Sequence, residues 1–190
     1  MSAVAVSPTR PVGWWGMITL VAAEATLFGC FIGTYFFLRF STAVWPPAGV
    51  PRPAVTVPAV LALVLASTSV PMTLALRAVR AARLGAARLF LVAALVVQAG
   101  YFAYEVHDFQ HQLRSFTPQT DAYGSIYFTM LGADHAHVAV GLLLDLWLLL
   151  KLARGLTRYR LTATWAITVY WYAVSLITLA VIGTLLSARA

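Results

Sequence analysis

The stretch "YGSIYFTMLGADHAHVAVGLLLDLWLLL" (Tyr123 to Leu150) decides the fold class of this chain. It is apolar over a length that exceeds the ~20 residues a helix needs to cross a hydrocarbon core. It also contains ionisable side chains, and an aspartate at the centre of a bilayer costs roughly 2.5–3.5 kcal/mol. These side chains are Asp134, His135, His137 and Asp145. We therefore predict a membrane helix whose polar groups have partners or a purpose.

The whole chain has the composition of a polytopic membrane protein. Of its 190 residues, 61% are hydrophobic and 10% are charged, whereas a soluble domain carries about 25% charged residues. Its mean hydropathy is +0.83. The net charge of +7 comes from basic residues in predicted loops, which indicates membrane topology, and we expect no nucleic-acid partner. Cys30 is the single cysteine, so thiol redox chemistry is not expected.

Five apolar segments are long enough to span a membrane, and they predict an all-α bundle of five transmembrane helices. The predicted spans are about 14–38, 55–76, 89–106, 123–150 and 162–186. Pro71 is expected to kink the second span. Residues 1–12 are interpreted as a flexible tail, because they lack the basic region and apolar core of a signal peptide. Residues 13–190 then form the transmembrane domain.

The basic residues predict how the chain crosses the membrane. Nine of them fall on the side shared by the N-terminus, the second loop and the fourth loop, and four fall on the other side. The nine are Arg10, Arg77, Arg80, Arg83, Arg88, Lys151, Arg154, Arg158 and Arg160, and the four are Arg39, Arg52, Arg114 and Arg189. The positive-inside rule then places the N-terminus in the cytoplasm and the C-terminus outside.

Helix geometry separates the polar residues of the fourth span. At about 100° per residue, Asp134, His137, Gly141 and Asp145 fall within an arc of roughly 80°. We expect this stripe to face the other helices. His135 lies well off the stripe, and it points to nearly the opposite side from His137. The two histidines are therefore not predicted to bind one metal ion together.

The other spans contain further polar groups. Glu24 lies near the middle of the first span. It is either a proton-active carboxylate or a structural group that bonds to another helix, with His137 as a candidate partner. Gln98 lies in the third span, and Glu105 and His107 near its outer end are expected to be interfacial. The candidates for buried, proton-active groups are Glu24, Asp134, His137 and Asp145.

The sequence gives little support for a metal or haem site. His107 and His111 are four residues apart and could share a helix face, but a zinc site usually takes three or four ligands. The first, second and fifth spans contain no histidine that could face a haem. No nucleotide-binding loop or Ser/His/Asp arrangement is present, so we assign no catalytic, metal-binding or cofactor-binding residue.

Two further patterns concern helix packing and lipid. Small residues permit close helix approach, and the candidates are Gly29, Gly33, Gly132, Gly141 and Gly183. Basic residues at a membrane surface either set topology or bind anionic lipid headgroups. The candidates for lipid binding are Arg77, Arg80, Lys151 and Arg154.

Five short motifs occur in order over about residues 13–187. They are Trp15-Gly16-Met17 before Glu24, "WPPAG" (Trp45 to Gly49), Gln98-Ala99, the set Tyr123-Gly124-Ser125 with Gly132, His137-Val138 and Gly141, and finally Tyr170-Trp171. In this order and spacing the chain resembles subunit III of haem–copper oxidases, the cytochrome c oxidase type. Its five spans resemble the short bacterial form, which lacks two N-terminal helices of longer members.

The chain departs from the family pattern at three places. The usual His-x-x-His-Val is Asp134-x-x-His137-Val, and the usual Gln-x-x-Glu is Gln98-x-x-Tyr101. The usual Trp-His-Phe-Val-Asp is Trp171-Tyr172-Ala173-Val174-Ser175. These departures indicate a divergent branch.

The resemblance implies a non-catalytic subunit in the bacterial inner membrane. Such a subunit packs on the catalytic subunit I with other oxidase subunits, holds phospholipid and supports proton uptake. Haems and copper are then expected in the partner subunits and no cofactor in this chain, and Glu24 would be the membrane carboxylate of the family. Three alternatives stay open. They are an accessory subunit of nitric oxide reductase, a small transporter or proton channel, and a haem- or metal-binding redox protein that uses the histidines.

Overall fold

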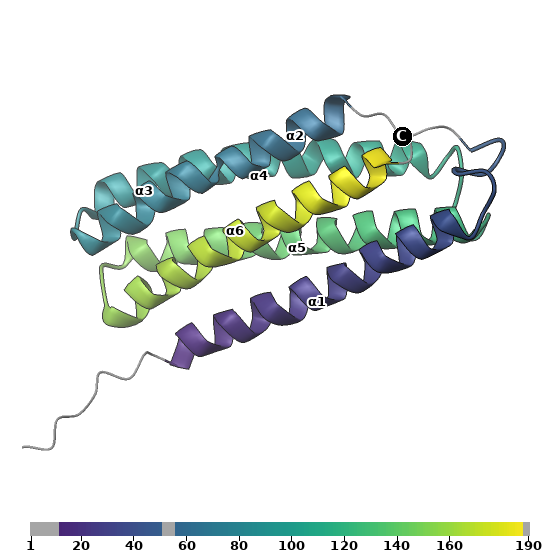
Figure 1. The fold of residues 1–190 in the computed structure, drawn as a ribbon. Helices are drawn as coiled ribbons and strands as arrows, with labels where there is room; N and C mark the ends of the chain where they lie inside the picture. Colours follow the sequence, from purple (N-terminus) through teal and green to yellow (C-terminus); the bar gives the residue numbers. More distant parts are fainter. Residues whose placement is uncertain (1–11, 51–55, 188–190) are drawn as a thin grey trace, which may run out of the picture.

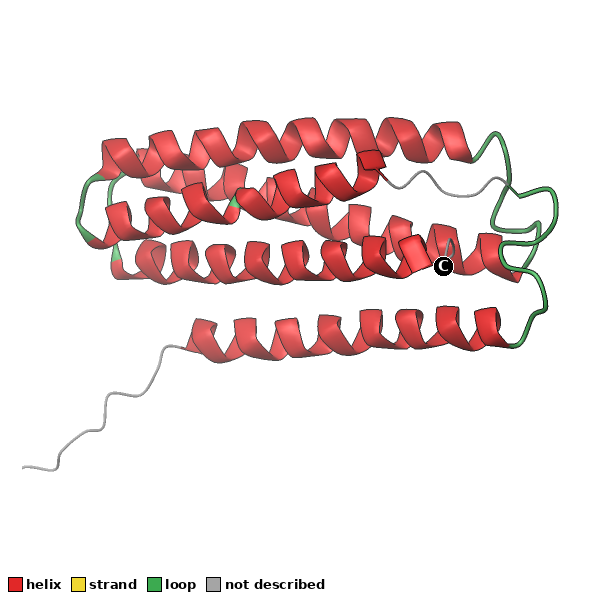
Figure 2. Cartoon of the chain, turned by 45° about the horizontal axis from the view of Figure 1, so that its top comes forward, coloured by secondary structure: helices red, strands yellow, loops and turns green. Residues whose placement is uncertain are grey.

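The computed structural model describes residues 12–50 and 56–187, which form a bundle of roughly parallel and antiparallel helices (Figure 1). The helices are α1 (Val12–Phe40), α2 (Thr56–Ser67), α3 (Ser69–Arg80), α4 (Leu84–Gln112), α5 (Ala122–Ala153) and α6 (Arg158–Leu186). Within these described ranges there are helices and loops but no strand (Figure 2). The predicted all-α class is confirmed.

Among the described residues five spans are long and apolar enough to cross a membrane, and α2 and α3 together make one of them, Thr56–Arg80. The break between them falls at Thr68, whose N–H donates to the Leu65 carbonyl at 3.0 Å. Pro71 follows in the first turn of α3. A proline has no N–H to donate, and its ring clashes with the carbonyl four residues earlier, which is that of Ser67. The predicted kink of the second span is therefore present as a helix break.

The helices contain the predicted spans. Four of these spans lie wholly within one helix, and the second (55–76) runs from Thr56 through α2 into α3, across the break at Thr68. Of the predicted flexible tail, residues 1–11 lie outside the described residues, and Val12 begins α1. The orientation of the two ends across the membrane stays a prediction.

The helix α6 lies at the centre of the bundle. It packs against α1, α2, α3 and α5, whereas α1 packs only against α5 and α6 among the helices described. Figure 1 shows α1 at one edge, with α2, α3 and α4 beyond α5 and α6. On α1 only Phe28 and Tyr35 are fully buried. The first helix is thus the most exposed part of the bundle and depends on few contacts.

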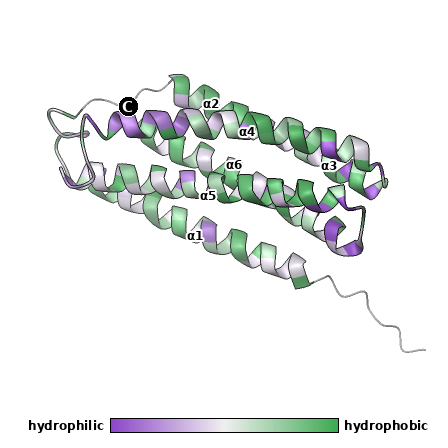
Figure 3. Ribbon diagram, turned by 180° about the vertical axis from the view of Figure 1, so that it is seen from behind, coloured by the Kyte–Doolittle hydropathy of each residue, from purple (hydrophilic) through white to green (hydrophobic). Residues whose placement is uncertain are grey.

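Apolar side chains cover the outside of the bundle as well as its core. Exposed examples are Leu63, Leu89, Leu143 and Leu176, each more than 60% accessible. Figure 3 shows hydrophobic colouring along most of the helices, with hydrophilic residues gathered towards their ends. Such a surface is stable only where lipid replaces water as the solvent. This agrees with a chain that spans a membrane.

Local signals fix the two ends of α5, the helix that contains most of the polar groups. The Asp121 side chain caps its start by accepting from the Gly124 N–H at 2.7 Å. At the other end Gly155 has φ of +102°, a left-handed conformation that glycine adopts without the steric cost of a Cβ. The chain therefore turns sharply into α6, which begins at Arg158.

Candidate functional site

A glutamate and a histidine join α1 to α5. The Nε2 atom of His137 lies 2.8 Å from Oε2 of Glu24, and Nδ1 lies 2.7 Å from the Ala133 carbonyl oxygen. Because a carbonyl oxygen only accepts, Nδ1 carries a hydrogen. One further proton must then lie between Nε2 and Oε2, either as an imidazolium–carboxylate pair or as an imidazole with a carboxylic acid. In both forms the pair has no net charge, which suits its place inside the membrane.

Neighbouring side chains hold His137 in place. The Phe28 ring meets the imidazole edge-to-face, with ring centroids 5.3 Å apart. The Tyr170 hydroxyl on α6 donates to the backbone carbonyl of His137 at 2.8 Å. The hydrogen bond between Glu24 and His137 considered from the sequence is therefore present, and it lies where α1, α5 and α6 meet. The proton activity of these two residues stays a prediction.

Asp134 bonds to a different helix from its neighbour His137. Its Oδ1 accepts from the Thr178 hydroxyl on α6 at 2.7 Å, and the carboxylate is 2% exposed. Tyr101 on α4 lies close to both Asp134 and Thr178. Asp134 therefore links the centres of α4, α5 and α6, and it does not pair with His137.

Asp145 lies in a second buried contact, one that reaches the break between α2 and α3. One terminal atom of the Gln98 amide lies 2.8 Å from Oδ2 of Asp145, and the other lies 3.1 Å from Oγ1 of Thr68. If the amide nitrogen faces Asp145, it donates to a carboxylate. If the amide oxygen faces Asp145, the aspartate must carry the proton. Either arrangement ties α4, α5 and the second span together through side chains that are at most 2% exposed.

The predicted stripe on α5 does face the bundle, but its members meet different helices. His137 meets α1, Asp134 meets α6 and Asp145 meets α4. Gly141 lies against the fully buried Trp171 ring of α6, and a Cβ on this glycine would be 2.6 Å from Cζ2 of that ring. The Trp171 indole also lies beside the Asp145 carboxyl, outside the geometry of a direct hydrogen bond. The residues of the stripe therefore make separate contacts with several helices and do not form one polar cluster.

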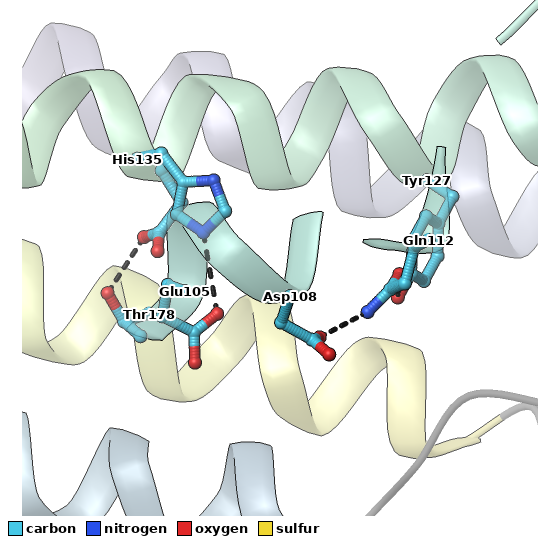
Figure 4. A network of polar contacts seen from close by, with 7 residues as sticks. Glu105, Asp108, Gln112, Tyr127, His135 and Thr178 are labelled. Carbon is cyan, nitrogen blue, oxygen red and sulfur yellow. Dashed lines mark hydrogen bonds and ion pairs between the residues drawn. The ribbon is translucent and has the colours of Figure 1, made fainter. Parts of the chain in front are cut away.

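Glu105, expected near the membrane interface, has a buried partner that the sequence analysis did not predict. Glu105 is 6% exposed, and its Oε2 lies 3.4 Å from Nε2 of His135, which is 8% exposed (Figure 4). The helix α4 continues to Gln112, past the predicted end at 106, so Glu105 is followed by two further helical turns. The spacing of Gln98, Tyr101 and Glu105 is i, i+3, i+7, which places all three on one helix face. That spacing is the signal that could have identified this pair.

The histidines do not form a metal site in the described ranges. His135 faces α4 and His137 faces α1, as the helix geometry predicts. His107 and His111 are both exposed on α4. No group of three or more His, Cys, Asp or Glu side chains is arranged to hold a metal ion in this part of the chain.

The comparisons with known proteins agree with this helical bundle. A family model described as "Cytochrome c oxidase subunit III" matches residues 9–185. The chain belongs to the cytochrome c oxidase subunit III family. It is 27% identical over 169 residues to "Cytochrome c oxidase subunit 3" of Bacillus subtilis (strain 168), which covers 87% of this chain and 80% of that protein.

Relatives in this subunit III family include subunits of quinol oxidases. The chain is 27% identical over 167 residues to "Cytochrome bo(3) ubiquinol oxidase subunit 3" of Pseudomonas aeruginosa, covering 84% of this chain and 76% of that protein. It is 26% identical over 165 residues to "Quinol oxidase subunit 3" of Bacillus subtilis (strain 168), covering 85% and 78%. With its five apolar spans, this subunit III is a multi-pass bacterial membrane protein.

Two of the positions that depart from the subunit III pattern lie beside each other. Tyr101, at the usual glutamate position, lies beside Asp134, at the usual histidine position. Ser175 is buried on α6, one turn before Thr178, and Tyr172 bonds to Thr73 on α3. Of the departing residues, Tyr101 and Asp134 therefore share one buried polar group with Thr178, whereas the Ser175 hydroxyl has no hydrogen-bond partner among the described residues.

The basic candidates for lipid binding gather at one end of this subunit III bundle. Arg77 and Arg80 end α3, and Lys151 and Arg154 end α5. The Lys151 ammonium lies 5.7 Å from the centre of the Trp147 ring. Trp147 also lines an apolar groove of about 510 Å³ between α1, α5 and α6, together with Met17, Leu143, Tyr159 and Ile167.

Proposed function

We propose that this chain is the non-catalytic subunit III of a haem–copper terminal oxidase in aerobic respiration. The observation that supports the proposal is that the buried ionisable groups are paired within the chain. Glu24, Glu105, Asp134 and Asp145 each bond to a side chain on a neighbouring helix of the same chain. Polar groups paired in this way join helices within a membrane. Such a chain supports a partner that carries out the chemistry.

The partner in this proposal is the catalytic subunit I, assembled with other oxidase subunits. It would hold the haems and copper and reduce oxygen to water, and no cofactor is assigned to this chain. The exposed side of α1 is the surface that we propose for this contact. Gly29 and Gly33 are exposed there, and nothing lies within 4 Å of a Cβ built on either residue. Small residues one helical turn apart allow a partner helix to approach closely.

Phospholipid binding is the second part of the proposal. The groove of about 510 Å³ is lined mainly by apolar side chains, which suits an acyl chain. Lys151 lies beside the groove over Trp147 and can attract an anionic headgroup. Arg77, Arg80 and Arg154 extend this positive charge at the same end of the bundle.

Co-purification tests the proposed function. A tag on this chain, with purification in mild detergent, is expected to recover a haem–copper catalytic subunit with bound phospholipid. Oxygen consumption with cytochrome c and with quinol then identifies the electron donor, and exchanging Lys151 for glutamine is expected to reduce the phospholipid recovered. Recovery of a stable, lone chain would contradict the proposal, and recovery of a nitric oxide reductase would favour the related accessory role.

Glu24→Ala is expected to leave the initial oxygen turnover of the complex largely intact while reducing assembly and long-term activity. The change removes the hydrogen bond to His137 from a helix that buries only Phe28 and Tyr35 fully. Loss of such a bond costs about 1–3 kcal/mol. The measurements are the yield of the purified complex and oxygen consumption over repeated turnover.

The matched control for Glu24 is Thr26→Ala. Thr26 is exposed on the same helix, and its hydroxyl bonds only to the Ala22 carbonyl of its own helix at 2.9 Å. This variant is expected to behave like the parent protein. Immediate and complete loss of oxygen reduction in Glu24→Ala would show that Glu24 is essential to turnover itself.

A further inference from the structure

A small cavity lies between α4, α5 and α6, beside the Glu105–His135 pair. Its volume is about 20 Å³, and one water molecule needs about 10–15 Å³ of such space. The polar residues that line it are Glu105, Asp108, Gln112, Tyr127 and His135, and its other walls are apolar. A water bound in a protein usually makes two to four hydrogen bonds, and these side chains supply them.

Hydrogen bonds connect this cavity with the end of α4. Gln112 donates from Nε2 to Oδ2 of Asp108 at 2.5 Å, and the Tyr127 hydroxyl donates to Oε1 of Gln112. Figure 4 shows this group in line with the Glu105–His135 contact. Glu105 and His135 are buried, whereas Asp108 and Gln112 are half-buried next to the loop 113–121. Asp108 and Gln112, which also line the cavity, are thus more exposed than the pair and lie nearer the loop.

The charges around Glu105 leave its carboxylate with one cationic partner at most. On α4 the titratable neighbours are Tyr101 and Asp108, and on α5 they are Tyr127, Asp134 and His135. The residues that α2 and α6 contribute to the cavity wall are Pro58, Ile182, Leu185 and Leu186, which do not titrate. No Lys or Arg lines this cavity among the described residues. Only His135 or a proton on Glu105 itself can neutralise the buried negative charge.

We propose that the cavity holds water and that the Glu105–His135 pair exchanges protons with the aqueous phase at the α4–α5 loop. On uptake, an O–H bond of a hydronium ion in the cavity breaks and an O–H bond forms at a Glu105 carboxylate oxygen, which leaves a water molecule. The 3.4 Å separation of Nε2 and Oε2 is longer than a usual N–H···O bond. It leaves both atoms able to bond to that water. This site is separate from Glu24–His137 and does not depend on which oxidase the chain serves.

Infrared difference spectroscopy of the tagged complex, in acidic minus alkaline buffer, tests the proposal. We expect a carbonyl band of a protonated carboxylic acid that is lost in Glu105→Gln and shifted in His135→Gln. His107→Gln removes an exposed histidine from the same helix and is expected to leave the band unchanged. A spectrum in which no pH-dependent band is lost in Glu105→Gln would overturn the proposal.

Exchange of the complex into D2O tests the path to the cavity. The Glu105 band is expected to shift promptly in the parent protein and more slowly in Tyr127→Phe, which retains the ring but removes the hydroxyl. A band that does not shift in D2O, or that shifts equally fast in both proteins, would overturn the path. If Glu105→Gln prevents assembly, the shift of the band in His135→Gln decides the assignment, and an unmoved band rejects it.

Discussion

Replacing Gly141 by valine is expected to prevent the bundle from forming a stable structure. A Cβ at this position would lie 2.6 Å from Cζ2 and 2.9 Å from Cη2 of Trp171, whereas carbon atoms pack at about 3.5–4.0 Å. The indole is fully buried, so it has no free space into which to turn. Overpacking of this kind costs about 1–3 kcal/mol or more. We expect a lower midpoint of thermal unfolding and little accumulation of the chain in membranes.

Gly100→Val is the control for this prediction. Gly100 lies on the exposed side of α4, and nothing is within 4 Å of a Cβ built there. The Gly100→Val variant has the same change in helix propensity as Gly141→Val but no collision with a neighbouring side chain. Its midpoint of thermal unfolding is therefore expected to match that of the parent protein. A double variant, Gly141→Val with Trp171→Leu, is expected to recover part of the lost stability. If Gly141→Val and Gly100→Val were equally stable, the helices α5 and α6 would have to be able to separate enough to admit the added side chain.

The membrane fold could be predicted because apolar length alone identifies a spanning helix. The spans around Phe28, Leu91 and Val138 are predominantly apolar over the length that a spanning helix needs, and lipid imposes a helix on any segment that crosses it. The break at Thr68 required Pro71 as a signal, and that signal was visible. Which helices touch was not visible, because it depends on side chains that meet across the bundle.

For the polar residues, the helix face could be predicted from the sequence, but the bonding partners could not. The face shared by Asp134, His137 and Asp145 follows from a period of 3.6 residues, and so does the divergence of His135 from His137. The partner of Asp134 is Thr178, and a threonine in an apolar span gives no signal of that role. Glu105 was missed because the apolar run ends near it, while the helix continues for two further turns to Gln112.

The same limit applies to the small residues. Gly29, Gly33, Gly132, Gly141 and Gly183 were all expected to allow close packing, but only Gly141 lies where a Cβ would collide with a neighbouring helix. Sequence spacing shows that a glycine can admit a neighbour and does not show whether a large ring occupies the space. At Gly141 the space is occupied by the Trp171 ring of α6.

Gln98→Leu is expected to destabilise the chain by about 1–3 kcal/mol or more, because it leaves Asp145 buried with no hydrogen-bond partner on its side chain. Asp145 is 1% exposed, its Oδ1 already lacks a partner, and Gln98 is the group that bonds to Oδ2. The same substitution at Gln110, which is exposed on α4, is the control and is expected to have little effect. Thermal or denaturant unfolding of the purified chain in detergent measures the difference.

The double variant Gln98→Leu with Asp145→Leu distinguishes a paired contact from two independent ones. Removing both polar groups leaves neither of them buried without its partner, so the double variant is expected to be more stable than Gln98→Leu alone. Asp145→Asn is expected to retain the contact, because an amide can donate to or accept from Gln98. Additive losses in the double variant would show that the two residues are not coupled. The packing of α4 against α5 around Asp145 would then depend on apolar contacts.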